Sequence, residues 1–228
     1  MCASVSAFTG EMLMPFKPAV LVVVAATCLS LSSCAGFRGG WESIPYIGNP
    51  PPTPSVSRTS FEAGKRSELL LPGLKVRIDL NNRIQDNHYQ VYGVVPVPKD
   101  SSESRASLVK PERISLRLEV REEGFVFRSH LAVLGVAGKT ASAVAGYERG
   151  KYDLSGYKGG FWEEPKPIAE EYILSPGIYY LFVEFPLPVP VPQTPDITLD
   201  LSKALQAPGK PPIPLIRFLP VRWEEGYS

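Results

Sequence analysis

The sequence predicts an all-β protein with a sandwich architecture and little helix. Apolar and polar residues alternate with a period of two in several segments, and Gly, Asn, Asp and Pro separate those segments. The chain also holds 24 prolines, which long helices and central strands tolerate poorly. Short strands divided by turns, with few helical signals, are typical of a mostly antiparallel β-sandwich.

The first clear strand pattern lies in residues 74–80, where four apolar residues alternate with Lys and Arg and Asp. This pattern predicts a half-buried strand with one face in water. Asn- and Asp-rich residues 81–87 predict a turn region, and a second alternating segment follows over residues 89–95.

The strongest alternation is RISLRLEVR, residues 113–121, with aliphatic side chains on one face and mostly charged side chains on the other. Glu122, Glu123 and Gly124 form a turn signal. Residues 125–133 alternate again, so we predict that they pair with residues 113–121 as a hairpin.

Residues 178–185, IYYLFVEF, are apolar or aromatic on nearly every position and follow a Ser-Pro-Gly turn. This composition predicts a central strand covered on both faces. The stretch LSPGIYYLFVEF resembles the turn and strand of many extracellular β-sandwich domains. We therefore expect a single immunoglobulin-like β-sandwich over residues 61–228.

Three further segments have weaker patterns. Residues 132–145, rich in Ala, Gly and Val, fit a short helix or a loop, and residues 197–205 fit a strand that runs into a helical turn. Residues 215–219 and 221–223 predict one or two final strands after Pro214.

Two segments alternate proline with valine or leucine, at residues 94–98 and 185–192. Each proline removes a backbone donor, so these segments cannot pair on both sides. We expect them to leave the sheet or to protect its edge from aggregation. A polyproline segment recognised by a partner is the alternative.

The N-terminal part contains an apolar run, Ala19 to Leu31, preceded by Lys17. Its length suits the core of a signal peptide and is too short for a membrane-spanning helix. The run ends in Leu31-Ser32-Ser33-Cys34, which resembles the lipobox of bacterial lipoproteins. The resemblance implies removal of residues 1–33, with Met12 as an alternative start, and acylation of Cys34. An ordinary cleaved signal or an uncleaved anchor is the alternative.

Cysteine usage agrees with lipidation. The chain has three cysteines, and cleavage before Cys34 would remove Cys2 and Cys28, so no internal disulfide is possible in the mature chain. Acyl groups on Cys34 would anchor the protein to a membrane without spanning it. Ala35 is not the acidic residue of inner-membrane retention, so in a Gram-negative cell the resemblance favours the outer membrane, facing the periplasm.

Residues 34–60 are rich in Gly, Pro and Ser and show no apolar period, so we predict a flexible, lipidated tether. The net charge is +1, and both charged residues of the leader, Glu11 and Lys17, would leave together. The basic stripe that nucleic-acid binding requires is missing.

Sequence motifs for catalysis are weak, and we predict no catalytic residues, no metal and no cofactor. Gly138-Lys139-Thr140 lacks the earlier glycine of a phosphate-binding loop, because position 133 is Val133. The two histidines, His88 and His130, are too few for zinc, and no serine stands in a G-x-S-x-G elbow. Adjacent glutamate pairs are expected to be solvated charges.

The most unusual stretch is GYERGKYDLSGYKGGFW, residues 146–162, in which aromatic and basic side chains lie among glycines. Such a composition fits a recognition loop, or a glycine-kinked hairpin whose aromatics cover the sandwich. The candidate binding residues are Tyr147, Arg149, Tyr152, Tyr157, Lys158, Phe161 and Trp162.

Together these features predict a lipid-anchored envelope protein with a non-catalytic binding or structural role. We expect it to be an accessory subunit of an envelope assembly, attached to the membrane through Cys34 and to a protein partner through the sandwich. The alternatives are a periplasmic immunity-type lipoprotein that binds a toxin, and an enzyme or binder acting on cell-wall sugars.

Overall fold

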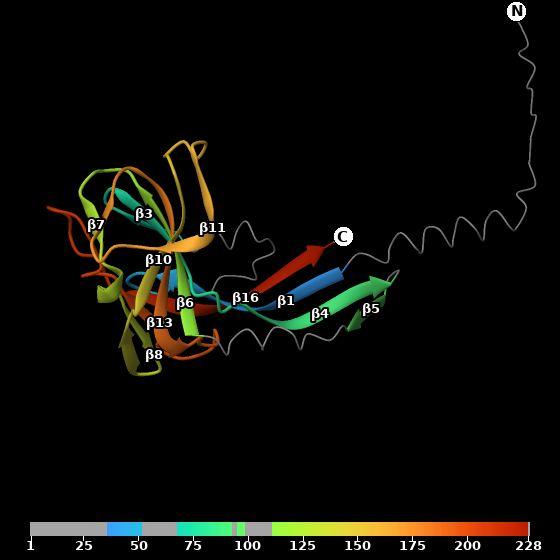
Figure 1. Ribbon diagram of the computed structural model, residues 1–228. Helices are drawn as coiled ribbons and strands as arrows, with labels where there is room; N and C mark the ends of the chain where they lie inside the picture. The colour runs from blue at the N-terminus through green and yellow to red at the C-terminus, as the bar shows by residue number, and fades with distance from the viewer. Residues whose placement is uncertain (1–35, 52–67, 93–94, 99–110, 228) are drawn as a thin grey trace, which may run out of the picture.

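The computed structural model describes residues 36–51, 68–92, 95–98 and 111–227 (Figure 1). Within these ranges the chain is built almost wholly from strands, with one 3-10 turn, η3 (Ser129–Leu131). The strands are β1 (Gly36–Tyr46), β2 (Glu68–Leu71), β3 (Leu74–Asp79), β4 (Ile84–Tyr92), β5 (Val95–Pro98), β6 (Pro111–Val120), β7 (Phe125–Phe127), β8 (Val133–Val136), β9 (Lys139–Ser142), β10 (Ala145–Tyr152), β11 (Gly159–Pro167), β12 (Tyr172–Leu174), β13 (Gly177–Pro188), β14 (Thr198–Asp200), β15 (Leu205–Gln206) and β16 (Ile216–Tyr227).

The strands form three antiparallel sheets. The first has seven strands in the order β5-β4-β1-β16-β14-β8-β9, and the second has six in the order β11-β10-β13-β6-β3-β2. A small third sheet has the order β12-β7-β15. The prediction of an all-β, mostly antiparallel sandwich with little helix is confirmed.

One hydrophobic cluster receives side chains from all three sheets. In β6 the residues Ile114, Leu116, Leu118 and Val120 are buried, as their alternation predicted. The seven-stranded sheet adds Leu134, Leu199 and Ile216, and the small sheet adds Phe125, Phe127, Leu174 and Leu205. Burial of this apolar surface is the main favourable term that holds the sandwich together.

The predicted central position is confirmed, because β13 lies between β10 and β6 in the six-stranded sheet. The expected cover on both faces is wrong, because Tyr180 and Phe182 lie half-buried on the outer face. Tyr179 is fully buried, and its hydroxyl donates a hydrogen bond of 2.9 Å to the carbonyl of Ser175. This bond satisfies the polar end of a large core side chain.

The prediction of a flexible tether over residues 34–60 is wrong for Gly36–Tyr46. These residues form β1, which pairs with β16 over its whole length and with β4 over its first half. Residues 52–60 of the predicted tether lie outside the described residues.

The predicted hairpin between residues 113–121 and 125–133 is also wrong. After Val120 the chain leaves the six-stranded sheet, and β7 pairs with β12 and β15 instead. Residues 132–145, expected as a short helix or a loop, contain the β8–β9 hairpin. Residues 197–205 follow the prediction, since β14 runs into a helical turn closed by the bond from Leu205 N to the carbonyl of Leu201.

The proline-rich segments lie at edges and exits. The segment Val95–Pro98 is the edge strand β5, which pairs only with β4 among the described strands. In β13 the register shifts between Phe185 and Pro188, and residues 189–192 are outside any strand. These placements agree with the expectation that proline limits pairing to one side.

Candidate functional site

The candidate site lies on the outer face of the six-stranded sheet, opposite the hydrophobic core. A single row of register partners crosses five strands there. In order from β11 through β10, β13 and β6 to β3, the row consists of Phe161, Gly150, Tyr180, Arg117 and Arg77. Register partners share a face of a sheet, so these side chains lie beside one another.

Gly150 makes room for an aromatic cluster on this face, formed by Tyr152, Phe161 and Tyr180. A Cβ at Gly150 would lie 2.6 Å from the carbonyl oxygen of Gly160 and 2.7 Å from Cδ1 of Phe161. Because that space is free, Phe161 reaches across to Tyr180, with ring centroids 4.7 Å apart and planes at 62°. Tyr152 meets Phe161 edge-on at 5.6 Å. Phe161 keeps 53% of its surface exposed.

Three arginines surround the aromatic cluster. Arg77 and Arg117 are direct cross-strand partners. Arg149 lies at the bulge of β10, where its Nη1 donates a hydrogen bond of 3.2 Å to the carbonyl of Glu163. Together with the aromatic rings they line a shallow groove of about 270 Å³, the arginine-aromatic groove. Its lining residues are Arg77, Asp79, Ser115, Leu116, Arg117, Arg149, Phe161, Tyr180, Leu181 and Phe182.

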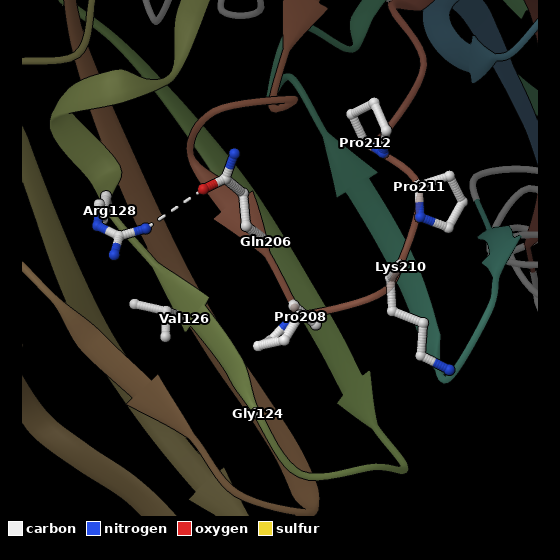
Figure 2. Close-up of a pocket in the computed structure, with 9 residues that line it drawn as sticks. Gly124, Val126, Arg128, Gln206, Pro208, Lys210, Pro211 and Pro212 are labelled. Atoms are coloured by element: carbon white, nitrogen blue, oxygen red, sulfur yellow. Dashed lines mark hydrogen bonds between the residues drawn. The ribbon is translucent and has the colours of Figure 1, made fainter.

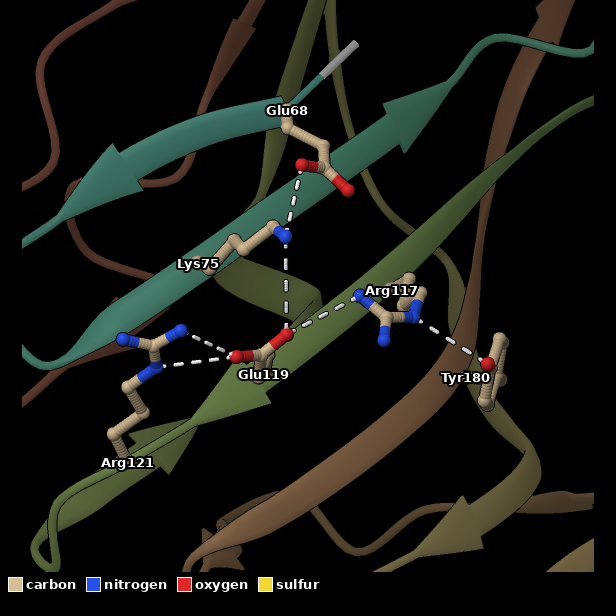
Figure 3. A network of polar contacts seen from close by, with 6 residues as sticks. All are labelled: Glu68, Lys75, Arg117, Glu119, Arg121 and Tyr180. Atoms are coloured by element: carbon tan, nitrogen blue, oxygen red, sulfur yellow. Dashed lines mark hydrogen bonds and ion pairs between the residues drawn. The ribbon is translucent and has the colours of Figure 1, made fainter. Parts of the chain in front are cut away.

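Glu119 neutralises the basic residues on one side of the groove. Figure 3 shows the side chains of Lys75, Arg117 and Arg121 converging on its carboxylate, at 3.9, 3.6 and 2.7 Å. The hydrogen bond from Arg121, helped by the charges of all three cations, lowers the pKa of Glu119 although partial burial opposes this. Arg117 Nε also donates 3.3 Å to the hydroxyl of Tyr180, so the guanidinium is oriented toward the aromatic cluster.

The other two groove arginines are not neutralised in this way. Within the described part of the chain, neither Arg77 nor Arg149 makes an ion pair with a carboxylate, and Asp79 is the single acidic residue in the groove lining. Like charges directly opposite each other across a strand pair are destabilising. An anionic group placed between Arg77, Arg117 and Arg149 would therefore be favoured, since guanidinium groups bind carboxylate and phosphate through two parallel hydrogen bonds.

The residues predicted as a binding loop are divided by the structure. They belong to the β10–β11 hairpin, and Arg149, Tyr152 and Phe161 contribute to the groove and its aromatic cluster. Tyr147 lies on the same outer face, where Arg113 stands 5.6 Å from its ring. A glycine-kinked hairpin with aromatics over the sheet was one of the two predicted alternatives.

Trp162 has a structural contact rather than a place in the groove. Its Nε1 donates a hydrogen bond of 2.8 Å to the buried carboxylate of Glu148, which also accepts a hydrogen bond from the hydroxyl of Tyr172. Lys166 stands 3.7 Å over its ring. These contacts fix β11 against β10 and the small sheet.

Tyr157 and Lys158 lie in the turn at the end of the hairpin. Tyr157 is 91% exposed. The turn is closed by Asp153, whose carboxylate accepts from Ser155 Oγ at 2.6 Å and from Lys158 N at 3.3 Å. These hydrogen bonds, chiefly that from Ser155, lower the pKa of Asp153.

Sequence reasoning missed the groove residues outside the hairpin, whose outward-facing members are Arg77, Asp79, Ser115, Arg117, Tyr180 and Phe182. All occupy outward positions of strands that the sequence did predict. The polar face of RISLRLEVR was therefore visible in the sequence as a candidate surface. The residues that lie beside that face on β3 and β13 follow only from strand order and register.

A second concavity of about 580 Å³ lies beside the small sheet (Figure 2). It is lined by Gly124, Val126, Arg128, Gln206, Ala207, Pro208, Lys210, Pro211 and Pro212. Its charges are already paired: Arg128 binds Glu171 at 2.8 Å, and Lys210 binds Glu122 at 2.6 Å. This concavity has less unsatisfied charge than the arginine-aromatic groove.

The histidines lie far apart in the fold, His88 on β4 and His130 on η3, where Nε2 is 3.8 Å from Glu170. Among the described residues no group of three or more His, Cys, Asp or Glu is placed to hold a metal ion. The described part of the chain likewise has no helix long and apolar enough to span a membrane. Cys34 lies outside the described residues.

Comparisons of this chain with protein-family models, with curated proteins and with solved structures found no match.

Proposed function

We propose that this protein is a lipid-anchored bacterial envelope protein that binds a protein partner through the arginine-aromatic groove and has no catalytic role. The observation that carries the proposal is the cross-strand pair of Arg77 and Arg117, with Arg149 beside it, next to an exposed aromatic cluster. The favoured setting is an accessory subunit of an envelope assembly.

The composition of the groove supports a protein partner. Arginine and aromatic residues are the side chains most enriched at protein interfaces and at their energetic hot spots. Phe161 and Tyr180 offer ring surface that a partner can cover, and Arg77 and Arg149 offer guanidinium groups without a carboxylate among the described residues. We infer that the partner supplies an acidic side chain to the arginines and an apolar one to the rings.

The envelope location rests on the sequence. Leu31-Ser32-Ser33-Cys34 follows an apolar run of signal-peptide length, and lipidation of Cys34 would hold the sandwich at a membrane. In a Gram-negative cell the outer membrane, on its periplasmic side, is the favoured location.

The test is a pull-down from solubilised envelope membranes with the acylated full chain. The wild-type protein should capture a partner that the double variant Arg77→Ala/Arg149→Ala loses. Arg217→Ala, an exposed arginine on β16 outside the groove, is the matched control and should capture as the wild type does. Equal capture by all three proteins would contradict the role of the groove.

Two further results would overturn other parts of the proposal. Cys34→Ser should abolish acylation and release the protein from membranes, so unchanged membrane retention would contradict the lipid anchor. Turnover of purified cell-wall fragments that disappears on substitution of one acidic residue would contradict the non-catalytic role.

A further inference from the structure

Four strands leave the sandwich and form a projecting arm, which we define as residues 36–44 of β1, strands β4 and β5, and residues 219–227 of β16. Figure 1 shows this arm extending away from the packed sheets, with the start of β1 and the end of β16 at its tip. Among the residues whose burial is described, the main hydrophobic cluster takes none from residues 84–89 of β4, and from β16 it takes only Ile216 and Phe218. The arm is therefore a separate part of the fold.

The arm is an ordered ribbon. β1 is paired on both sides, with β16 from Gly36 to Tyr46 and with β4 from Gly36 to Trp41. Trp223, only 4% exposed, donates through Nε1 to the carbonyl of Ile84 at 3.2 Å, and the guanidinium of Arg83 stacks 3.6 Å over its ring. These contacts connect β16 with the start of β4 across β1, which lies between them.

Charged side chains reinforce the ribbon toward its tip. The carboxylate of Glu225 binds Arg83 at 3.1 Å and also contacts Arg38. Partial burial works to raise the pKa of Glu225, but the two arginines outweigh it and lower the pKa. The carboxylate of Asp86 on β4 accepts a hydrogen bond of 3.0 Å from Nε1 of Trp41 on β1 and forms an ion pair of 3.3 Å with Arg222 on β16.

The tip carries a stacked aromatic pair, in which Phe37 is exposed and Tyr89 is half-buried. The ring of Phe37 stacks on Tyr89 with centroids 4.9 Å apart and an interplanar angle of 25°, and Phe37 remains 40% exposed. Gly226 is the register partner of Phe37 on β16. Cys34 precedes Gly36 by two residues, and two residues of extended chain span at most about 7 Å.

We infer that the tip of the arm contacts the lipid bilayer and that the arm holds the sandwich at a fixed height above it. This inference rests on the proposed acylation of Cys34, which would place the acylated residue within about 10 Å of Phe37, three residues along the chain. That depth is the membrane–water interface, where Tyr is enriched and where Phe occurs on the apolar face of surface-bound segments, so both rings of the Phe37–Tyr89 pair suit it. Residues 219–227 of a strand span about 27 Å, so the sandwich stands roughly that far from the anchor.

The consequence for the groove is geometric. A flexible tether would let the sandwich tumble over the membrane, whereas an arm paired on both sides of β1 restricts it to a narrow range of orientations. The arginine-aromatic groove would then face partners at a set distance from the membrane surface.

The experiment uses the acylated full chain with one added cysteine, since Cys34 is modified and the other two cysteines lie in the removed leader. An environment-sensitive NBD fluorophore is attached at Gly226→Cys on the tip, or at Tyr157→Cys in the hairpin turn of the sandwich. A Cβ at Gly226 meets no atom closer than 3.8 Å, so the first variant should fold. Both proteins are bound to phosphatidylethanolamine–phosphatidylglycerol vesicles that contain doxyl-labelled lipid.

The inference predicts that the probe at position 226 shifts to shorter wavelength and is quenched several-fold more than the probe at position 157. Phe37→Ser in the Gly226→Cys background should weaken that quenching while the protein still floats with the vesicles. Flotation with equally low quenching at both positions would overturn the arm inference and leave the lipid anchor intact. An unmodified Cys34 in the mass spectrum, with no flotation, would instead overturn the lipid anchor and the inference that rests on it.

Discussion

The sandwich and the arm are held together by different forces. The sandwich shares one hydrophobic cluster among three sheets, in which residues such as Leu118 and Phe127 are fully buried. The arm has a much smaller apolar group, chiefly Ile44, Val221 and Trp223, and depends on strand pairing, ion pairs and a stacked arginine. This difference predicts that the arm opens locally at a lower free energy than the cooperative core of the sandwich.

The largest effect should come from the same substitution made once in each region. Phe127→Ala removes a fully buried ring from the sandwich and should cost about 3–5 kcal/mol in the free energy of unfolding. Phe37→Ala removes a ring that is 40% exposed on the arm tip and should cost less than about 1 kcal/mol. Urea denaturation followed by circular dichroism measures both, and similar costs would contradict the division into two regions.

The second prediction concerns a buried carboxyl group in the sandwich. Glu112 is fully buried, and neither of its carboxyl oxygens has a hydrogen-bond partner among the described residues. Burial, together with the nearby charge of Asp79, raises the pKa of Glu112 from 4.5 to about 8. The carboxyl therefore keeps its proton in the folded protein at neutral pH.

The sign of the pH dependence follows from proton binding. Between pH 4.5 and about 8 the folded state holds a proton that the unfolded state releases, so stability falls by about 1.4 kcal/mol per pH unit as pH rises. Glu112→Gln should remove this slope, leave stability at pH 4 nearly unchanged and raise it at pH 7 by roughly 3 kcal/mol. Urea titrations at several pH values test this against the exposed control Glu163→Gln, and parallel profiles for Glu112→Gln and wild type would refute it.

The third prediction acts on the arm alone and compares two Gly→Ala changes within it. A Cβ at Gly40 would lie 1.9 Å from the carbonyl oxygen of Ile84, whereas a Cβ at Gly226 would meet nothing nearer than 3.8 Å. Gly40→Ala should therefore separate β1 from β4, and Gly226→Ala should not. In hydrogen exchange, amides of residues 84–89 should exchange faster in Gly40→Ala only, with those of β6 and β13 unchanged. Faster exchange throughout β13 would show that the arm and the sandwich unfold together.

Gly40 also explains why the arm was not predicted. Strand prediction relies on alternation, which appears where one face of a strand is buried against a core, as in β6. The sequence GFRGGWESIPY of β1 lacks that alternation, because Gly39 and Gly40 allow the close approach of β4. Gly39 and Gly40 suggested a flexible linker, but in the structure they lie where the backbones of neighbouring strands pack closely against β1.

The groove shows a second limit of sequence reasoning. Arg149, Tyr152 and Phe161 were predicted because they are close in sequence and unusual in composition. Arg77 and Arg117 come from strands that are nonadjacent in sequence, and only the register of β3, β6 and β13 places them beside Phe161. Long-range pairing of this kind is decided by packing of the whole sandwich, which local patterns do not report.

The smallest effects should come from exposed charges, and they sharpen the comparison further. Arg113 on the outer face of the sandwich binds Glu184 at 2.6 Å, but its side chain is 50% exposed, so Arg113→Ala should cost no more than about 0.5 kcal/mol. Arg83, the residue before β4 at the base of the arm, is 39% exposed, yet it stacks on Trp223 and binds Glu225 of the arm. Arg83→Ala should cost about 1 kcal/mol, the sum of a cation–π contact and an ion pair.

The two losses should also differ in where they appear. The cost of Arg83→Ala should appear as faster hydrogen exchange along residues 219–225, with the urea midpoint of the sandwich unchanged, because Trp223 and Glu225, which Arg83 contacts, lie outside the main cluster. High salt should remove most of the effect of Arg113→Ala, since its ion pair with Glu184 is exposed and the ring of Tyr147 lies 5.6 Å away. It should leave most of the Arg83 effect, since Arg83 stacks 3.6 Å over the buried ring of Trp223. Equal salt sensitivity of the two variants would mean that the arm depends on exposed ion pairs rather than on the packing of Arg83 against Trp223.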